Sequence, residues 1–140
     1  MEYLFRGKRV DNGEWIEGSL VNNIFFFAGT NCSAPYIINP DEYEEYCCME
    51  DIGELAVKVL EETVGQFTGL LDKHGRKIFE GDIMLLGHIT KRKTVIEYDS
   101  LRAKFVARLF DKNSIRMAVS FWSAGEVIGN IHDNPEPLKE

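Results

Sequence analysis

The sequence has few cysteines and no long hydrophobic run, and both absences exclude classes of protein. Its three cysteines, Cys32, Cys47 and Cys48, are an odd number with two of them adjacent, which argues against a disulfide framework. They have no C-x-x-C spacing, and no histidine lies within four residues of one, so neither a metal nor an organic cofactor is predicted. The most apolar run, residues 24–28, is far shorter than the roughly 20 residues that a membrane-spanning helix needs.

The beginning of the sequence also lacks features that direct a protein out of the cell. It has neither the apolar segment nor the small-residue cleavage site of a signal peptide. We therefore expect the protein in the cytoplasm and not at a membrane. A cytoplasmic protein would keep its thiols reduced, which agrees with the cysteine pattern.

Short motifs of common enzymatic chemistry are absent as well. The sequence contains no G-x-S-x-G, no P-loop, no H-E-x-x-H and no dinucleotide-binding glycine pattern. We predict a protein without catalytic residues. The alternative is a small metal-independent hydrolase or nuclease that uses Glu80, Asp82 and His132. Structural roles are favoured for these three, because aspartates beside a turn glycine commonly accept hydrogen bonds from turn amides, and His132 precedes a proline-containing tail.

The residues that are present indicate a mainly β protein. The 140 residues suit one domain, and 44 % hydrophobic and 28 % charged residues are typical of a globular protein. Short alternating or apolar segments are separated by glycine, asparagine and aspartate, which predicts roughly nine strands in a small barrel-like antiparallel core. We divide the single domain 1–140 into an N-terminal hairpin (3–21), a variable segment (25–54) and a barrel block (63–132).

The candidate strands follow from these turn signals. Eleven segments are candidates for the roughly nine strands: residues 5–10, 14–21, 24–28, 55–60, 64–71, 77–79, 83–86, 94–98, 101–109, 117–122 and 126–132. One short helix is predicted near residues 40–51, where Asn39-Pro40-Asp41-Glu42 has the form of a helix start. In the 101–109 segment, Leu101, Ala103, Phe105, Ala107 and Leu109 are expected to face the core.

Charge is distributed unevenly along the chain. Residues 73–116 contain eleven lysines and arginines against five acids, a net charge of +6. Since the whole chain has a net charge of −7, the remaining residues have a net charge of −13. Such asymmetry indicates either an anion-binding face or an attraction between two parts of one domain. The candidate nucleic-acid-binding residues are Lys91, Arg92, Lys93, Arg102, Lys104 and Arg108. The alternative role for such a basic row is to prevent edge-to-edge strand pairing.

A second candidate surface lies in the variable segment. Phe25, Phe26 and Phe27 are consecutive, and Tyr43 and Tyr46 are spaced to share one face of the predicted helix. Apolar residues bordered by acids are typical of protein interfaces, so these five residues are candidates for self-association or for binding a protein partner. The alternative is that the phenylalanines fill the core. A protein partner or self-association is favoured, and nucleic acid is the second class of partner.

Four blocks of sequence resemble one known family. They are QFTGLLDKHGRKIFEGDIM (66–84), VIEYD (95–99), EVIGNIHDNPEPL (126–138) and the opening LFRGKRVDNGEWIEGSLV. Together they are similar to the YopX family of phage and prophage proteins. The resemblance implies a β-rich, barrel-like fold and an accessory role in the cytoplasm of the bacterial host. It implies no reaction, no cofactor and no catalytic residue.

Overall fold

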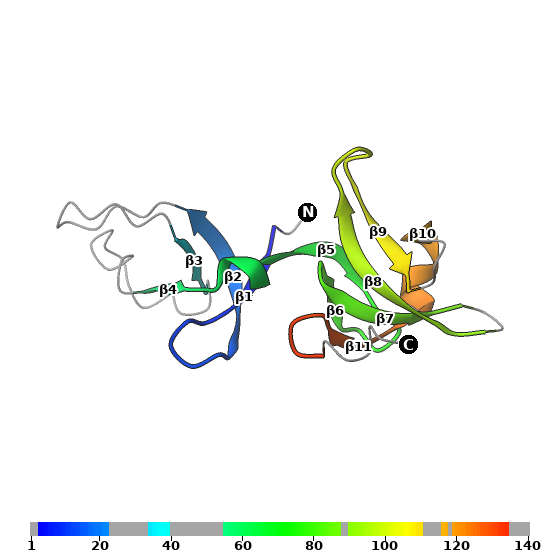
Figure 1. The fold of residues 1–140 in the computed structure, drawn as a ribbon, viewed down its shortest axis with the longest axis horizontal. Coiled ribbons are helices and arrows are strands. Elements are labelled where there is room, and N and C mark those ends of the chain that lie inside the picture. Colours follow the sequence, from blue (N-terminus) through cyan, green and yellow to red (C-terminus); the bar gives the residue numbers. More distant parts are fainter. Residues whose placement is uncertain are drawn as a thin grey trace. The chain divides into compact units, whose positions relative to one another are not determined.

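The chain folds into two compact units that share one strand. The computed structural model describes residues 3–22, 34–39, 55–87, 90–110, 116–117 and 119–134. Glu2–Gln66 forms the N-terminal unit and Phe67–Glu140 forms the C-terminal unit. Strand β5 (Gly65–Leu71) runs through the boundary between them (Figure 1). The two units are therefore joined by a continuous strand. The single-domain organisation stays a prediction.

The N-terminal unit is an antiparallel sheet. Its strands are β1 (Phe5–Lys8), β2 (Trp15–Asn22), β3 (Pro35–Ile38) and β4 (Ala56–Lys58), in the order β4-β3-β2-β1, and the first residues of β5 pair with β1. A short 3-10 helix, η3 (Glu61–Thr63), precedes β5. The hairpin between β1 and β2 was predicted, and Gly13 in its turn has φ of +72°, a backbone conformation that glycine adopts without steric cost.

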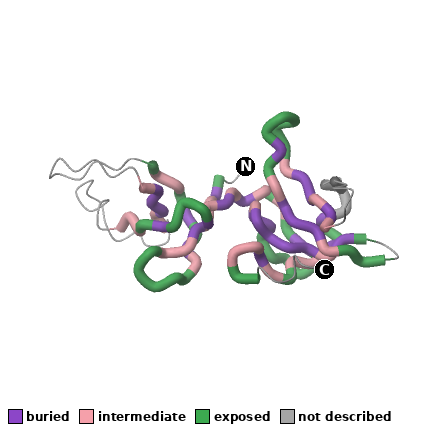
Figure 2. Tube along the Cα trace, in the orientation of Figure 1, coloured by how far each residue is buried: buried purple, intermediate pink, exposed green. Residues whose placement is uncertain are grey.

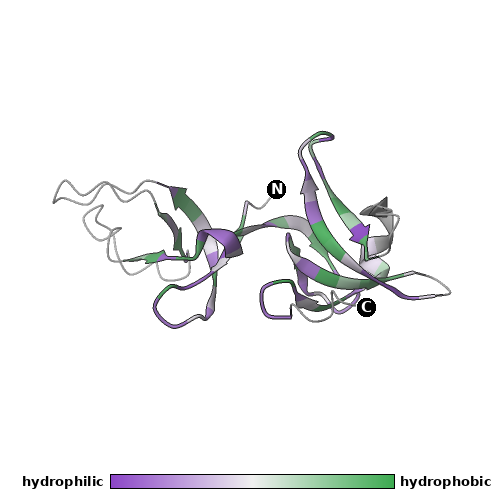
Figure 3. Cartoon of the chain, in the orientation of Figure 1, coloured by the Kyte–Doolittle hydropathy of each residue, from purple (hydrophilic) through white to green (hydrophobic). Residues whose placement is uncertain are grey.

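This sheet curls so that the residues after β4 pair with β1 and the residues that follow it. Beyond β4, Val59 forms an isolated bridge with Arg9, the Val10 amide donates to the Lys58 carbonyl (3.0 Å), and the Leu60 amide donates to the Lys8 carbonyl (2.8 Å). The curl encloses a small core of Ile16, Ile37 and Val59, to which the hydrophobic stretches of β2 and β3 contribute (Figure 3). The unit is barrel-like without being a closed barrel.

The C-terminal unit contains the second antiparallel sheet. The later residues of β5 pair with β6 (Lys77–Phe79). The sheet itself has the order β10 (Arg116–Met117), β9 (Lys104–Leu109), β8 (Arg92–Asp99), β7 (Asp82–Leu86), β11 (Glu126–Asn130). In the described residues this sheet is open, with β10 and β11 at its edges. The mainly β class is therefore confirmed.

The core of the C-terminal unit forms around a tryptophan that the sequence placed in a strand. Trp122 is fully buried against Ile78, Met84, Leu86, Ile96 and Ala107. The prediction of a strand at 117–122 is wrong, because Val119–Ala124 forms a 3-10 helix, η4. A helical turn carries Trp122 into the core. Gly125 follows it, and a Cβ at this position would clash with Leu86 Cδ2, so a larger residue would force the Leu86 side chain to move.

The hairpin between β8 and β9 also differs from its prediction. Leu101 and Ala103 were expected to face the core, but Leu101 is 93 % exposed, Ala103 is exposed, and β9 begins only at Lys104. The reason is a turn at residues 100–103, which the Asp99 carboxylate stabilises by accepting hydrogen bonds from the Leu101 amide (3.1 Å) and the Arg102 amide (3.3 Å). Ala107 and Leu109 are buried and Phe105 is partly buried against the core, as predicted, but Val106 on the opposite face of the strand is buried as well.

Several predictions concern segments outside the described residues. They are the strand at 24–28, the helix near 40–51, the three cysteines, and the interface candidates Phe25, Phe26, Phe27, Tyr43 and Tyr46. These stay predictions.

Truncating Trp122 tests the importance of the C-terminal core. Trp122→Ala should lower the free energy of unfolding by about 3–5 kcal/mol, because it removes a fully buried aromatic side chain. Trp122→Phe should cost clearly less, because within the described residues the buried indole Nε1–H has no acceptor, so no hydrogen bond is lost. Urea unfolding followed by circular dichroism measures both. Equal losses for the two variants would show that the indole donor has a partner.

Candidate functional site

The turn between β5 and β6 lies in the sequence block that carries the family resemblance. The Asp72 amide donates to the Arg76 carbonyl (2.8 Å), and the Gly75 amide donates to the Asp72 carbonyl (3.0 Å). Gly75 has φ of +77°. The sequence predicted a tight turn with a left-handed residue at its end, and this geometry confirms it. The strands on either side, Gly65–Leu71 and Lys77–Phe79, agree with the predicted strands to within one residue.

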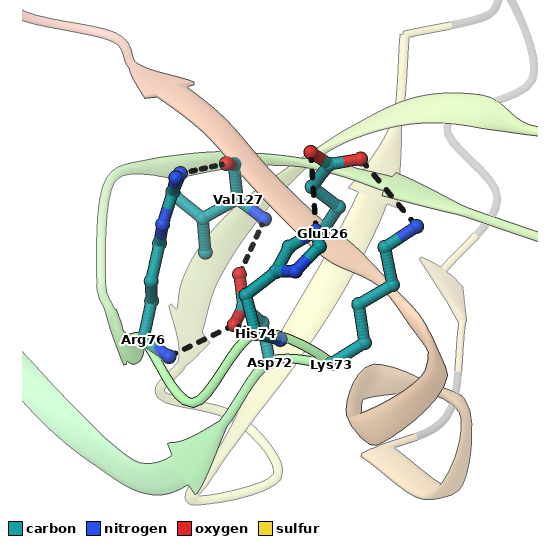
Figure 4. A network of polar contacts seen from close by, with 6 residues as sticks. All are labelled: Asp72, Lys73, His74, Arg76, Glu126 and Val127. Carbon is teal, nitrogen blue, oxygen red and sulfur yellow. Dashed lines mark hydrogen bonds and ion pairs between the residues drawn. The ribbon is translucent and has the colours of Figure 1, made fainter.

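The Asp72 carboxylate is the centre of a polar network (Figure 4). Asp72 is only 5 % exposed. Oδ1 accepts hydrogen bonds from the backbone amides of His74 and Arg76, both at 2.9 Å, and Oδ2 accepts one from the Val127 amide at 3.0 Å. Burial acts to raise the pKa of Asp72, but the amides of Val127, Arg76 and His74 stabilise the charged form and together lower this pKa below its usual value.

The same turn covers the outer edge of β11. Besides the Asp72–Val127 bond, the Lys73 amide donates to the Gly125 carbonyl (3.0 Å), and Arg76 Nη1 donates to the Val127 carbonyl (3.2 Å). Lys73 Nζ and His74 Nε2 lie 3.6 Å and 3.5 Å from the Glu126 carboxylate. The turn therefore supplies partners to an edge strand whose amides and carbonyls would otherwise face solvent.

The role of this turn was only half visible in the sequence. Its glycine and its aspartate predicted a turn. The contact with β11 gave no sequence signal, because Asp72 and Val127 are 55 residues apart. The carboxylate is already used by three backbone amides, so its chemistry here is structural.

The residues of the hydrolase alternative meet at a second turn. Gly81 has φ of +91°, and a Cβ built on it would lie 3.5 Å from His132 Nε2, so the imidazole lies against the residue that separates Glu80 from Asp82. However, Asp82 is 1 % exposed, and its Oδ2 accepts a hydrogen bond from the Phe79 amide at 2.8 Å. The backbone of His132 donates to Asn130 Oδ1 (3.0 Å). These contacts give Asp82 a structural role at the turn, as the sequence favoured.

Among the described residues, no three His, Cys, Asp or Glu side chains are arranged to hold a metal ion. None of the helices described here is long and apolar enough to cross a membrane.

The candidate nucleic-acid-binding residues are only partly brought together. Lys93, Lys104 and Arg108 share one face of the β8–β9 pair, as the register shows, whereas Arg92 lies on the opposite face and Arg102 lies in the turn. Two of the six pair with acids on the same hairpin. Arg108 Nη2 lies 2.8 Å from Glu97 Oε1, and Arg102 Nη1 lies 2.9 Å from Asp99 Oδ2. The assignment stays a prediction.

The outer end of the same hairpin exposes apolar side chains. We define the hairpin tip as residues 98–105; it projects from the sheet and is mostly exposed (Figures 1 and 2). Leu101 is 93 % exposed and Tyr98 is 48 % exposed. The Tyr98 ring packs edge-on against Phe105, with 5.3 Å between the ring centroids. The sequence predicted the turn at Asp99-Ser100 but not this surface, because the following strand was expected to begin at Leu101 with that side chain in the core.

Comparison with known proteins identifies the fold family. The family described as YopX protein matches residues 4–139, which is nearly the whole chain. The chain belongs to the YopX family. A solved structure with the same fold is that of protein EF1440 from Enterococcus faecalis, with 22 % identity, 99 % of each chain covered and a TM-score of 0.54. No curated protein matches the sequence.

The Asp72 network connects two of the YopX-like blocks. The block 66–84 contains Asp72, Lys73, His74 and Arg76, and the block 126–138 contains Glu126 and Val127. The two blocks are the two halves of one contact between a turn and an edge strand. The residues that carry the YopX resemblance in these two blocks therefore form a structural framework, which we define as the Asp72 network.

Replacing Asp72 tests that framework. Asp72→Asn should lower the free energy of unfolding by about 1–3 kcal/mol, because an amide group supplies one acceptor oxygen where the carboxylate supplies two, and a buried backbone amide loses its partner. Glu126→Gln, in the same network, should cost less than about 1 kcal/mol, because its ion pairs are half exposed and long. Urea unfolding at pH 7 measures both. A Glu126→Gln variant as unstable as Asp72→Asn would contradict the central role of Asp72.

The lowered pKa of Asp72 predicts how this stability depends on pH. A carboxyl whose pKa is lower in the folded state stabilises the protein above its unfolded-state pKa of about 3.9, and this stabilisation is lost as the pH falls through the folded-state pKa. The difference in stability between wild type and Asp72→Asn should therefore be constant above about pH 5 and narrow below about pH 3.9. Urea unfolding over this pH range tests it, and a difference that widens on acidification would contradict it.

Proposed function

We propose that this YopX protein is a non-catalytic module that binds another protein through the hairpin tip. The observation that supports this proposal is Leu101, whose side chain is 93 % exposed on an ordered turn. Burying a leucine side chain stabilises a complex by about 1.5–3 kcal/mol before the costs of association are subtracted. In this proposal the protein acts in the cytoplasm of the bacterial host of a phage or prophage.

The turn holds Leu101 in place before any partner arrives. Asp99 is 7 % exposed, and its carboxylate accepts hydrogen bonds from the Leu101 amide, the Arg102 amide and Arg102 Nη1. Ala103 then adopts φ of +52°, an uncommon conformation for a residue with a Cβ. Because the loop is already ordered by these contacts, little conformational entropy remains to be lost on binding.

The chemistry of the tip defines the partner that fits it. Leu101 and the edge of Tyr98 require an apolar pocket. Arg102, whose side chain is 59 % exposed, and the exposed Lys104 would lie at the border of that pocket. We therefore propose a protein partner with an apolar pocket and acidic residues around its rim, since charge complementarity steers such an encounter.

Replacing Leu101 tests the proposed surface with little risk to folding. Leu101→Ser should change stability by less than about 0.5 kcal/mol, because the side chain is almost fully exposed. Leu71→Ser is the matched control, since Leu71 is 49 % exposed on β5 and is not part of the tip. The wild type and both variants are immobilised and used to capture proteins from host cells, and each captured protein is purified and titrated against all three.

The expected result is a partner that binds the wild type and Leu71→Ser equally and Leu101→Ser at least about tenfold more weakly, which corresponds to the loss of one buried leucine. Partners that bind all three alike would contradict the proposal. A wild-type dimer that dissociates in Leu101→Ser would replace the proposed partner with a second copy of the chain.

A further inference from the structure

The N-terminal unit places most of its few cations on one surface. Glu2–Gln66 contains 13 acids but only four lysines and arginines, a net charge of −9. One of the four, Arg9, is committed to Asp11, with two hydrogen bonds of 2.9 Å and 2.7 Å. The other three are Arg6, Lys8 and Lys58. Their positions follow from the strand register.

The register puts these three side chains on the outer face of the sheet. In β1 and β2, Arg6 is opposite Glu17 and Lys8 is opposite Trp15, whereas Gly7 is opposite the core residue Ile16. The bridge between Arg9 and Val59 makes Lys8 a neighbour of Leu60 and makes Val10 a neighbour of Lys58. Directly paired residues point to the same side of an antiparallel sheet. We call the resulting surface the Trp15 face; it consists of Arg6, Lys8, Val10, Trp15, Lys58 and Leu60.

The indole of Trp15 is the aromatic centre of this face. The Arg6 guanidinium carbon lies 4.7 Å from the centroid of the Trp15 ring, and Lys8 Nζ lies 5.5 Å from it. Trp15 is half-buried, and its apolar neighbours Val10 and Leu60 are 49 % and 37 % exposed. Three cations, one indole and two exposed aliphatic side chains thus lie together on a sheet surface.

We infer that the Trp15 face binds single-stranded nucleic acid. Cations that line an aromatic side chain on a β-sheet are the combination that holds unpaired bases, because the ring and the guanidinium plane stack on a base while ammonium groups contact phosphates. Arg6 and Trp15 provide the stacking surface. Lys8 and Lys58 provide the phosphate contacts. A duplex fits less well, because its bases already stack on one another.

The surrounding charge limits the affinity and shapes the site. Glu17 is opposite Arg6 in the β1–β2 register, so an acid lies beside the three cations of the face. The charge of −9 on the whole unit repels a long polyanion, but repulsion from charges farther than about 10 Å is screened at 0.1 M salt. The site therefore accommodates a short stretch of nucleotides and shows a modest salt dependence.

The two tryptophans of the chain provide a direct assay. Trp122 is fully buried, so in the Trp122→Phe variant the fluorescence reports on Trp15 alone. The probes are fluorescein-labelled (dT)15 and (rU)15. Both should raise the anisotropy of the label with wild-type protein, and the unlabelled forms should quench Trp15. A preference for one of them identifies DNA or RNA as the ligand. Two phosphate contacts predict a slope of about −1.4 for log K against log salt concentration.

Two charge-matched double variants locate the site. Lys8→Glu with Lys58→Glu should weaken oligonucleotide binding at least about tenfold and reduce the salt slope. Lys91→Glu with Arg92→Glu changes the net charge equally at the rival basic segment, where both residues are exposed, and should weaken binding less than about threefold at 150 mM salt. Circular dichroism of both variants checks that they are folded.

Three results would overturn the inference. They are no anisotropy change with either probe at 50 mM salt, binding without quenching of Trp15, and loss of binding in the Lys91/Arg92 variant with retention in the Lys8/Lys58 variant. Leu101→Ser should bind both oligonucleotides like wild type, so this test and the test of the protein-binding tip fail or succeed separately.

Discussion

The hydrogen bond from the Val127 amide to the Asp72 carboxylate fixes the edge of the sheet in the C-terminal unit. It joins residues 55 apart and attaches the β5–β6 turn to the outer edge of β11. A charged acceptor that serves three amides in a buried position is worth more than a surface ion pair, because a buried amide without its partner keeps the full cost of desolvation. An open sheet needs some such cover, since an exposed edge strand invites pairing with other chains.

With β11 covered, the described part of the C-terminal unit has its most exposed apolar side chain at the hairpin tip. There too a buried aspartate organises the backbone, since Asp99 accepts hydrogen bonds from two amides and from Arg102. The two aspartates act alike but have opposite consequences. Asp72 removes an edge from solvent, whereas Asp99 fixes an exposed turn that presents Leu101. This difference is why we place the protein-binding surface at the tip and assign the Asp72 network to the framework.

Charge separates the two units as clearly as the fold does. The N-terminal unit carries −9 and the C-terminal unit +2, so the basic segment predicted from the sequence lies in the C-terminal unit. Within that unit, however, Glu97 and Asp99 engage two of the arginines. In the acidic unit, three of the four cations gather around Trp15. The total charge of each unit therefore does not show how its cations are distributed.

The sequence by itself determined the β class, the family and the boundaries of β2, β5, β6 and β7 to within one residue, because turn glycines and alternating side chains are local signals. It also indicated a structural role for Asp82. It did not predict β3. Only the tertiary structure decided that Trp122 enters the core from a 3-10 helix, that Leu101 is exposed, and that Asp72 reaches Val127. The same holds for the pairing of Arg108 with Glu97 across two strands and for the gathering of Lys8, Trp15 and Lys58 on one face. Each of these outcomes depends on which strands become neighbours, and local sequence carries no record of a partner that lies tens of residues away.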